Sequence, residues 1–172
     1  MYEQSRGGAE PSREDPKKNG QTPRKEQTMS TRSAIGVRLP DSTIQAVYCH
    51  NDGYPEYTGS ILCHRYTAPQ RIKALIALGA LSILGEKLKP APGAPHTFGN
   101  PQPNVTIAYH RDRNEPMQPA VSFATIEDYV TKAKEDFCAD YLYLFEDGGW
   151  KVYAVYGDRK WTALDAVVAG RN

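Results

Sequence analysis

The stretch SAIGVRLPDSTIQAVYCH, residues 33–50, decides the fold class. Two runs rich in β-branched and aromatic residues, 33–39 and 44–50, flank the sequence PDST at 40–43. Pro, Asp and Ser are typical turn residues, so the pattern predicts a β-hairpin. Side chains alternate across a strand, so Cys49 is expected in the core and His50 on the opposite face.

The overlapping stretch YCHNDGYPEY, residues 48–57, leads from the second strand into a helix. Asn and Asp tolerate left-handed backbone, and we expect Gly53 to supply a positive φ in the turn. Pro55 is typical of a first helical residue, and Glu56 beside it suits the positive end of the helix dipole. These features predict a helix from Pro55 to Tyr66.

Apolar periodicity predicts the remaining elements. They are a helix over 68–79, a strand over 104–113 that ends in a charged tip, a helix over 125–137, a hairpin over 141–157 and a short closing helix within 161–170. Residues 85–103 hold five of the thirteen prolines and predict a long loop. We therefore expect an α+β fold in a single domain over 29–172. Its antiparallel sheet has about five strands, with two to three helices packed on one face.

Residues 1–28 are nearly devoid of aliphatic side chains and mix both signs of charge with Gly, Pro and Gln. Such a segment buries too little apolar surface to offset its ordering entropy, so we expect a disordered tail. A short arm used in binding is the alternative. The composition changes abruptly at Met29, which suggests a second natural start or a tail added to a compact domain.

Composition argues against several classes of protein. Lys and Arg number 21 against 20 Asp and Glu, and this balance disfavours general nucleic-acid binding, which depends on a basic excess. No apolar run approaches the roughly 20 residues that cross a bilayer, and the N-terminus lacks a signal-peptide core. Three cysteines, Cys49, Cys63 and Cys138, are too few and odd for a disulfide framework. We expect a cytoplasmic protein without membrane association.

Five blocks occur in an order that is similar to a known family: STRSAIGV, YCHNDGYPEYTGSIL, LIALGALSILG, PHTFGNPQ and AYHRDRNE. Together, from Ser30 to Trp150, they resemble a family of small uncharacterised bacteriophage and prophage proteins with the pattern YCHxDGY, LIxLGxxSxLG and RDR. This chain departs at Asn51, His110 and Asn114, where the family commonly has Trp, Gly and Gly. The resemblance implies a phage accessory role in the host cytoplasm, such as host takeover or counter-defence, and no particular activity.

Two polar clusters are the candidate site. The candidate ligand-binding residues are His50, Asp52, Tyr54, Tyr109, Arg111 and Arg113. His50 ends a predicted strand, where a polar side chain can emerge, and Asp52 is placed to orient it. Guanidinium groups fork onto phosphate or carboxylate, and tyrosines can stack on a base. If both clusters lie at one end of the sheet, they form a pocket for a small anionic, nucleotide-like ligand. The alternative is that the two arginines pair with nearby carboxylates and brace loops.

Catalytic and metal signatures are missing from the sequence. Cys49 and His50 point to opposite faces, and no histidine spacing brings two metal ligands onto one helix face. Nucleotide-hydrolase and dinucleotide-binding motifs are absent, so we expect no catalytic residue, no metal and no cofactor. The leading hypothesis is a non-enzymatic phage protein that sequesters an anionic ligand. The alternatives are a protein–protein inhibitor of a host factor and a small hydrolase or phosphodiesterase using His50 and His110. We expect aromatic edge strands such as WKVYAVY, which favour pairing with a second copy, so a homodimer is expected.

Overall fold

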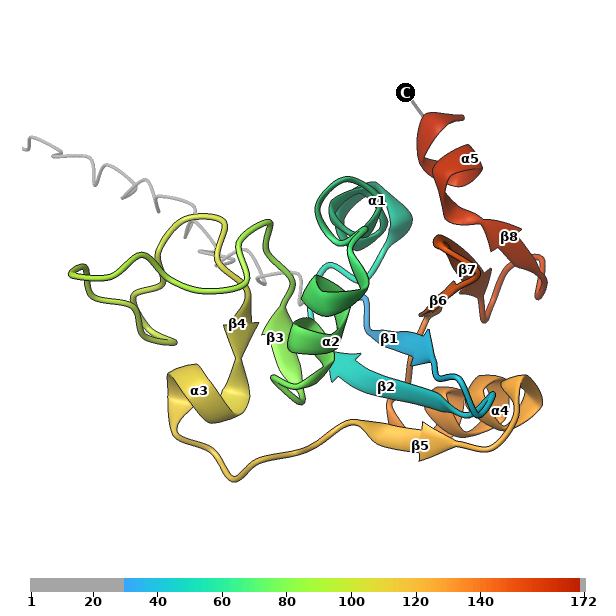
Figure 1. Ribbon diagram of the computed structural model, residues 1–172, viewed down its shortest axis with the longest axis horizontal. Helices are drawn as coiled ribbons and strands as arrows, with labels where there is room; N and C mark the ends of the chain where they lie inside the picture. The colour runs from blue at the N-terminus through green and yellow to red at the C-terminus, as the bar shows by residue number, and fades with distance from the viewer. Residues whose placement is uncertain (1–29, 171–172) are drawn as a thin grey trace, which may run out of the picture.

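The computed structural model describes residues 30–170, so the predicted tail over 1–28 lies outside the described residues (Figure 1). The strands are β1 (Ser33–Arg38), β2 (Ile44–Cys49), β3 (Leu81–Ile83), β4 (Ile107–Ala108), β5 (Val121–Phe123), β6 (Tyr141–Glu146), β7 (Gly149–Ala154) and β8 (Trp161–Ala163). The helices are a π-helical turn η1 (Pro55–Gly59), α1 (Ser60–Arg65), α2 (Pro69–Ile76), α3 (Tyr109–Arg113), α4 (Ile126–Asp136) and α5 (Leu164–Ala169). The predicted mixture of α and β structure is confirmed.

Both predicted hairpins are confirmed. β1 and β2 pair antiparallel over six residues, from Ser33 opposite Cys49 to Arg38 opposite Ile44. β6 and β7 pair antiparallel around a two-residue turn, where Asp147 and Gly148 have φ of 51° and 78°. Two consecutive residues with positive φ are typical of a turn that matches the twist of a hairpin, and Asp-Gly is a preferred sequence for it.

The sheet is mixed and larger than predicted. Within residues 30–170 its strands follow the order β4-β3-β2-β1-β6-β7-β8, and β5 also pairs with β2. β1 pairs parallel with β6, and β2 pairs parallel with β3, so the prediction of an antiparallel sheet of about five strands is wrong. β7 lies between β6 and β8, so the aromatic strand WKVYAVY is not at an edge.

Helices cover both faces of the sheet, not one as predicted. Alternate residues of β1 and β2 point to opposite sides, so that Ile35 and Val47 pack with α1, α2 and α5. Ala34 and Ala46 pack on the other side with α4. Figure 1 shows α4 on the side of β1 and β2 that faces away from α1. A two-sided core explains why the central strands are buried almost throughout.

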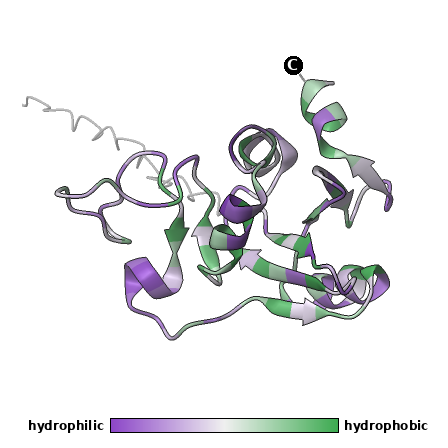
Figure 2. Ribbon diagram, viewed as in Figure 1, coloured by the Kyte–Doolittle hydropathy of each residue, from purple (hydrophilic) through white to green (hydrophobic). Residues whose placement is uncertain are grey.

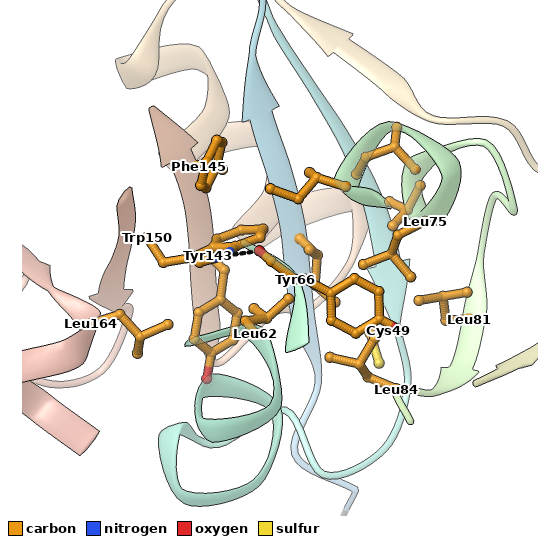
Figure 3. Close-up of a cluster of buried hydrophobic side chains, with 14 of the residues drawn as sticks. Cys49, Leu62, Tyr66, Leu75, Leu81, Leu84, Tyr143, Phe145, Trp150 and Leu164 are labelled. Atoms are coloured by element: carbon orange, nitrogen blue, oxygen red, sulfur yellow. Dashed lines mark hydrogen bonds between the residues drawn. The ribbon is translucent and has the colours of Figure 1, made fainter. Parts of the chain in front are cut away.

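The first core contains buried aromatic side chains whose polar atoms tie distant segments together (Figure 3). Trp150 Nε1 donates to the carbonyl of Tyr66 at 2.7 Å. Tyr143 Oη donates to the carbonyl of Gly53 at 2.8 Å, and Tyr66 Oη to that of Gly85 at 2.8 Å. Each bond satisfies a buried donor that would otherwise be costly. Cys49 lies in this core as predicted.

The predicted strand over 104–113 is wrong beyond Ala108. Only Ile107 and Ala108 are in a strand, and Tyr109 opens the helix α3, which is strongly hydrophilic in Figure 2. The Asp112 carboxylate accepts from the backbone N–H of Ala108, which satisfies a donor at the helix start. Asn114 ends the helix with left-handed backbone at φ 57°. The side chains of this segment therefore follow helical spacing, not strand alternation.

The corner after β2 needs glycine for space. Gly53 has no positive φ; Asp52 is the left-handed residue, with φ 53°. A Cβ on Gly53 would lie 2.7 Å from Ser33 Cβ and 2.9 Å from the Thr31 carbonyl oxygen. The turn residue predicted to be Gly53 is thus Asp52, a residue type that also tolerates this conformation.

Replacing Gly53 with Ala is expected to lower the free energy of unfolding by about 2 kcal/mol, because the new methyl group overpacks against the Ser33 side chain and the Thr31 carbonyl. Gly149→Ala is the matched control, because nothing lies within 4 Å of a Cβ at that position. Urea unfolding followed by circular dichroism measures both variants. Equal unfolding midpoints for the two variants would contradict this account of the corner.

Candidate functional site

Three side chains form a hydrogen-bonded chain at the end of β2. Arg32 Nε donates to Tyr48 Oη at 3.2 Å, and Tyr48 Oη lies 2.6 Å from His50 Nδ1. Arginine can only donate, so the phenol oxygen accepts from Arg32 and its own hydrogen is available for His50 Nδ1. This arrangement favours the His50 tautomer that carries its proton on Nε2. The chain therefore presents a cation, a phenol and an imidazole N–H in series.

The environment keeps two members of the chain uncharged near neutral pH. Burial lowers the pKa of His50, and the positive charge of Arg32 lowers it further. Burial also raises the pKa of Tyr48, against the opposing effect of Arg32. Arg32 is therefore the charged member of the chain at neutral pH.

The backbone of Arg32 is fixed by Asp140. The Arg32 N–H donates to Asp140 Oδ2 at 2.9 Å, and the Asp140 N–H donates to the Arg32 carbonyl at 2.8 Å. The terminal guanidinium nitrogens of Arg32, by contrast, have no hydrogen-bond partner among residues 30–170. Arg32 is thus held at its backbone and at Nε, while its two Nη groups can bind a ligand.

An open cavity of about 820 Å³ adjoins Arg32. Its walls come from the start of β1, from η1, from β6, β7 and β8, and from α5. The polar lining includes Arg32, Asp140, Tyr141 and Lys160. Its volume lies in the range of small-molecule sites. None of the six residues predicted to bind ligand lines this cavity.

The predicted residues at the end of β2 and in the corner after it make three different sets of contacts. His50 belongs to the chain with Tyr48. Asp52 forms the corner, where its carbonyl accepts from Thr58 Oγ1 at 2.8 Å. Tyr54 packs against Tyr57 at a ring-centroid distance of 6.3 Å.

Arg111 is bonded to other groups of the protein through its whole guanidinium. Its guanidinium forms two bonds to the Asp112 carboxylate and donates to the carbonyls of Leu88 and Thr106. The Asp112 side chain is 2% exposed, and His96 Nε2 lies 3.3 Å from it. Burial opposes ionisation of Asp112, but the bonds from Arg111 and Ala108 outweigh burial and lower its pKa. This cluster ties the predicted long loop to the start of α3.

Tyr109 and Arg113 belong to a stack on the same loop. The Phe98 ring lies 5.9 Å from the Tyr109 ring, nearly parallel to it, and the Arg113 guanidinium lies 4.7 Å from the Phe98 ring centroid. Arg113 also pairs with Glu115 at 3.2 Å. Both side chains hold Phe98 and the loop in place.

Sequence reasoning missed Arg32, Asp140 and Lys160. These residues come from three segments that are distant in the chain, and none stands in a motif with a recognisable spacing. The only local signal was Arg32, a charged residue directly before a buried strand.

Comparisons with protein-family models, with curated proteins and with solved structures give no match to this chain. Within residues 30–170, no three His, Cys, Asp or Glu side chains are grouped to hold a metal ion. None of the helices in the same range has the length and apolar character needed to cross a membrane.

Arg32→Ala is expected to raise the pKa of His50, because it removes a neighbouring positive charge. In the unmodified protein the folded pKa lies below the unfolded value of about 6.5, so the unfolded state binds more protons and stability falls as pH drops below about 6.5. The variant should lose less stability over this window. NMR titration of the His50 ring measures its pKa. An unchanged pKa in the variant would contradict the coupling between Arg32 and His50.

Asp112→Asn is expected to lower the free energy of unfolding by about 3 kcal/mol, because it leaves the partly buried Arg111 charge without its partner. Glu115→Gln is the matched control, since it removes the carboxylate that pairs with the exposed Arg113 and should cost less than about 1 kcal/mol. Chemical denaturation compares the two. Equal losses of unfolding free energy in the two variants would contradict the role of Asp112 as the buried partner of Arg111.

Proposed function

We propose that this protein is a non-enzymatic binding protein that sequesters a small anionic, nucleotide-like ligand. The observation that supports it is the state of Arg32. Arg32 is one of the residues that line a cavity of about 820 Å³. Tyr48 orients its guanidinium through Nε, and the terminal nitrogens have no hydrogen-bond partner within residues 30–170. A preoriented guanidinium fork suits a phosphate or carboxylate group.

The chemistry of Cys49 and Cys63, the two cysteines next to a histidine in the sequence, supports binding over catalysis. Burial raises the pKa of Cys49 to about 12 and that of Cys63 to about 11, so both thiols stay protonated and unreactive at neutral pH. The hydrolase alternative needs His50 and His110 as acid and base. The Nδ1 atom of His110 lies 2.8 Å from the Glu115 carbonyl, and that of His50 is held by Tyr48.

The family resemblance leads us to propose counter-defence in the host cytoplasm as the setting. A phage protein that holds a host-derived signalling nucleotide would act by stoichiometric capture. It would then need affinity and abundance, and no turnover. A cavity with one preoriented cationic anchor is consistent with such a role.

A second candidate function is inhibition of a host protein by direct contact. A groove of about 590 Å³ lies between the end of β1, α2 and the turn between β6 and β7, and its lining is mostly apolar. Met117, 45% exposed, lies on its rim. Exposed apolar surface of this kind is typical of protein-binding sites.

Isothermal titration calorimetry of the full chain against a panel of nucleotides tests the proposed function. We expect saturable binding of at least one nucleotide and none of the matching uncharged nucleoside, because Arg32 requires an anion. No binding across the panel would overturn the proposal. Capture of a defined host protein in its place would favour the inhibitor alternative.

A further inference from the structure

The cavity next to Arg32 carries balanced charge. Arg32 and Lys160 supply two cations, and Asp140 and Asp158 supply two carboxylates. Asp140 holds the Arg32 N–H with Oδ2. Lys160 Nζ lies 4.0 Å from Asp158 Oδ2, and both of these side chains are well exposed. The two carboxylates would therefore repel a highly charged anion while the cations attract it. A group with one negative charge would bind the Arg32 guanidinium with less repulsion from the carboxylates.

The remaining cavity surface suits a flat apolar ring. Pro55, Val152 and Val167 line one part of it. Tyr156 also lines the cavity and is 70% exposed, which is unusual for a large aromatic side chain. Lys134 Nζ lies 5.9 Å from the centroid of the Tyr156 ring. An exposed tyrosine at a cavity rim offers a stacking surface for a nucleobase.

We infer that this cavity binds a nucleotide whose phosphate carries a single negative charge, that is, a phosphodiester of the cyclic nucleotide class, and discriminates against nucleoside triphosphates. The phosphodiester lies on the Nη groups of Arg32, and the base lies against Tyr156 and the apolar wall. Asp140 accepts from a hydroxyl or amino group of the ligand. This inference rests on the proposed function and specifies both its site and its ligand class.

The cavity at Arg32 is a different site from the pocket that the sequence predicted around Arg111 and Arg113. Arg111 and Arg113 are engaged with Asp112 and Glu115, so they do not supply the phosphate contact. Arg32 has no ion-pair partner within 4 Å among residues 30–170. Unlike Arg111 and Arg113, Arg32 has a guanidinium that is oriented by a hydrogen bond and still has unpaired donors.

Calorimetry with 3′,5′-cyclic AMP, 3′,5′-cyclic GMP and ATP tests the inference on the full chain. At least one cyclic nucleotide should bind about tenfold or more tightly than ATP. Arg32→Ala should weaken cyclic nucleotide binding by about tenfold or more, because it removes charged hydrogen bonds. Arg113→Ala is the matched control, an arginine outside the cavity, and should leave the affinity unchanged.

Two further variants keep the test independent of Arg32 and of folding. Thr162→Phe places a ring in the cavity from β8 while retaining every charge, and should abolish binding with an unchanged circular dichroism spectrum. Asp140→Asn keeps an acceptor for the Arg32 N–H but removes one negative charge from the cavity. The variant should therefore show a smaller difference in affinity between cyclic nucleotides and ATP.

The outcomes separate the two proposals. If a cyclic nucleotide binds but neither Arg32→Ala nor Thr162→Phe weakens it, the site assignment is wrong and the proposed function stands. If ATP binds more tightly than both cyclic nucleotides, the inference on ligand charge is overturned. If no nucleotide binds, the proposed function itself fails.

Discussion

The structure depends on the coupling between Arg32 and Asp140. Two hydrogen bonds, one from each backbone N–H, join the start of β1 to the start of β6. They set the parallel register in which Ser33 lies opposite Tyr141. This register matters because β1 is the strand from which both layers of the core extend, with Ile35 on one side and Ala34 on the other. A slip by one residue would exchange the two faces of β1 and disrupt both cores.

The same coupling also determines which arginine has hydrogen-bond donors for a ligand. The backbone of Arg32 is fixed at the end of the sheet, where Tyr48 orients its guanidinium and where the residue lines the cavity. Arg111 is the contrasting case, since its guanidinium donates hydrogen bonds to Asp112 and to two backbone carbonyls. Two arginines with the same functional group therefore have different roles. Arg111 bonds to the long loop and to Asp112, whereas Arg32 has terminal donors that residues 30–170 do not use.

Local patterns predicted what local interactions decide. The hairpins, the helix start at Pro55 and the buried position of Cys49 follow from alternation and turn chemistry within a few residues. The parallel pairings were not predictable, because β1 and β6 are about a hundred residues apart and strands of two or three residues, such as β3 and β8, have no readable period. The segment YHRDR was read as strand because its helical character comes from Asp112 reaching back to Ala108. Among the predicted site residues, His50 lies in the hydrogen-bonded chain with Tyr48. For Arg32 the only local signal is a charged residue directly before a buried strand. Tyr156 is 70% exposed and lines the cavity, and no sequence pattern pointed to it.

The central claim is that Arg32, and no other arginine of the described residues, contacts the phosphate of a ligand. The most direct measurement is an NMR titration of the arginine Nε–Hε signals of the full chain with 3′,5′-cyclic AMP and 3′,5′-cyclic GMP. The account predicts that the Arg32 signal moves and saturates with at least one of these nucleotides, accompanied by the ring signals of His50, which is coupled to it through Tyr48. The signals of Arg111 and Arg113 should stay in place. Movement of the Arg113 signal with a stationary Arg32 signal would contradict the account.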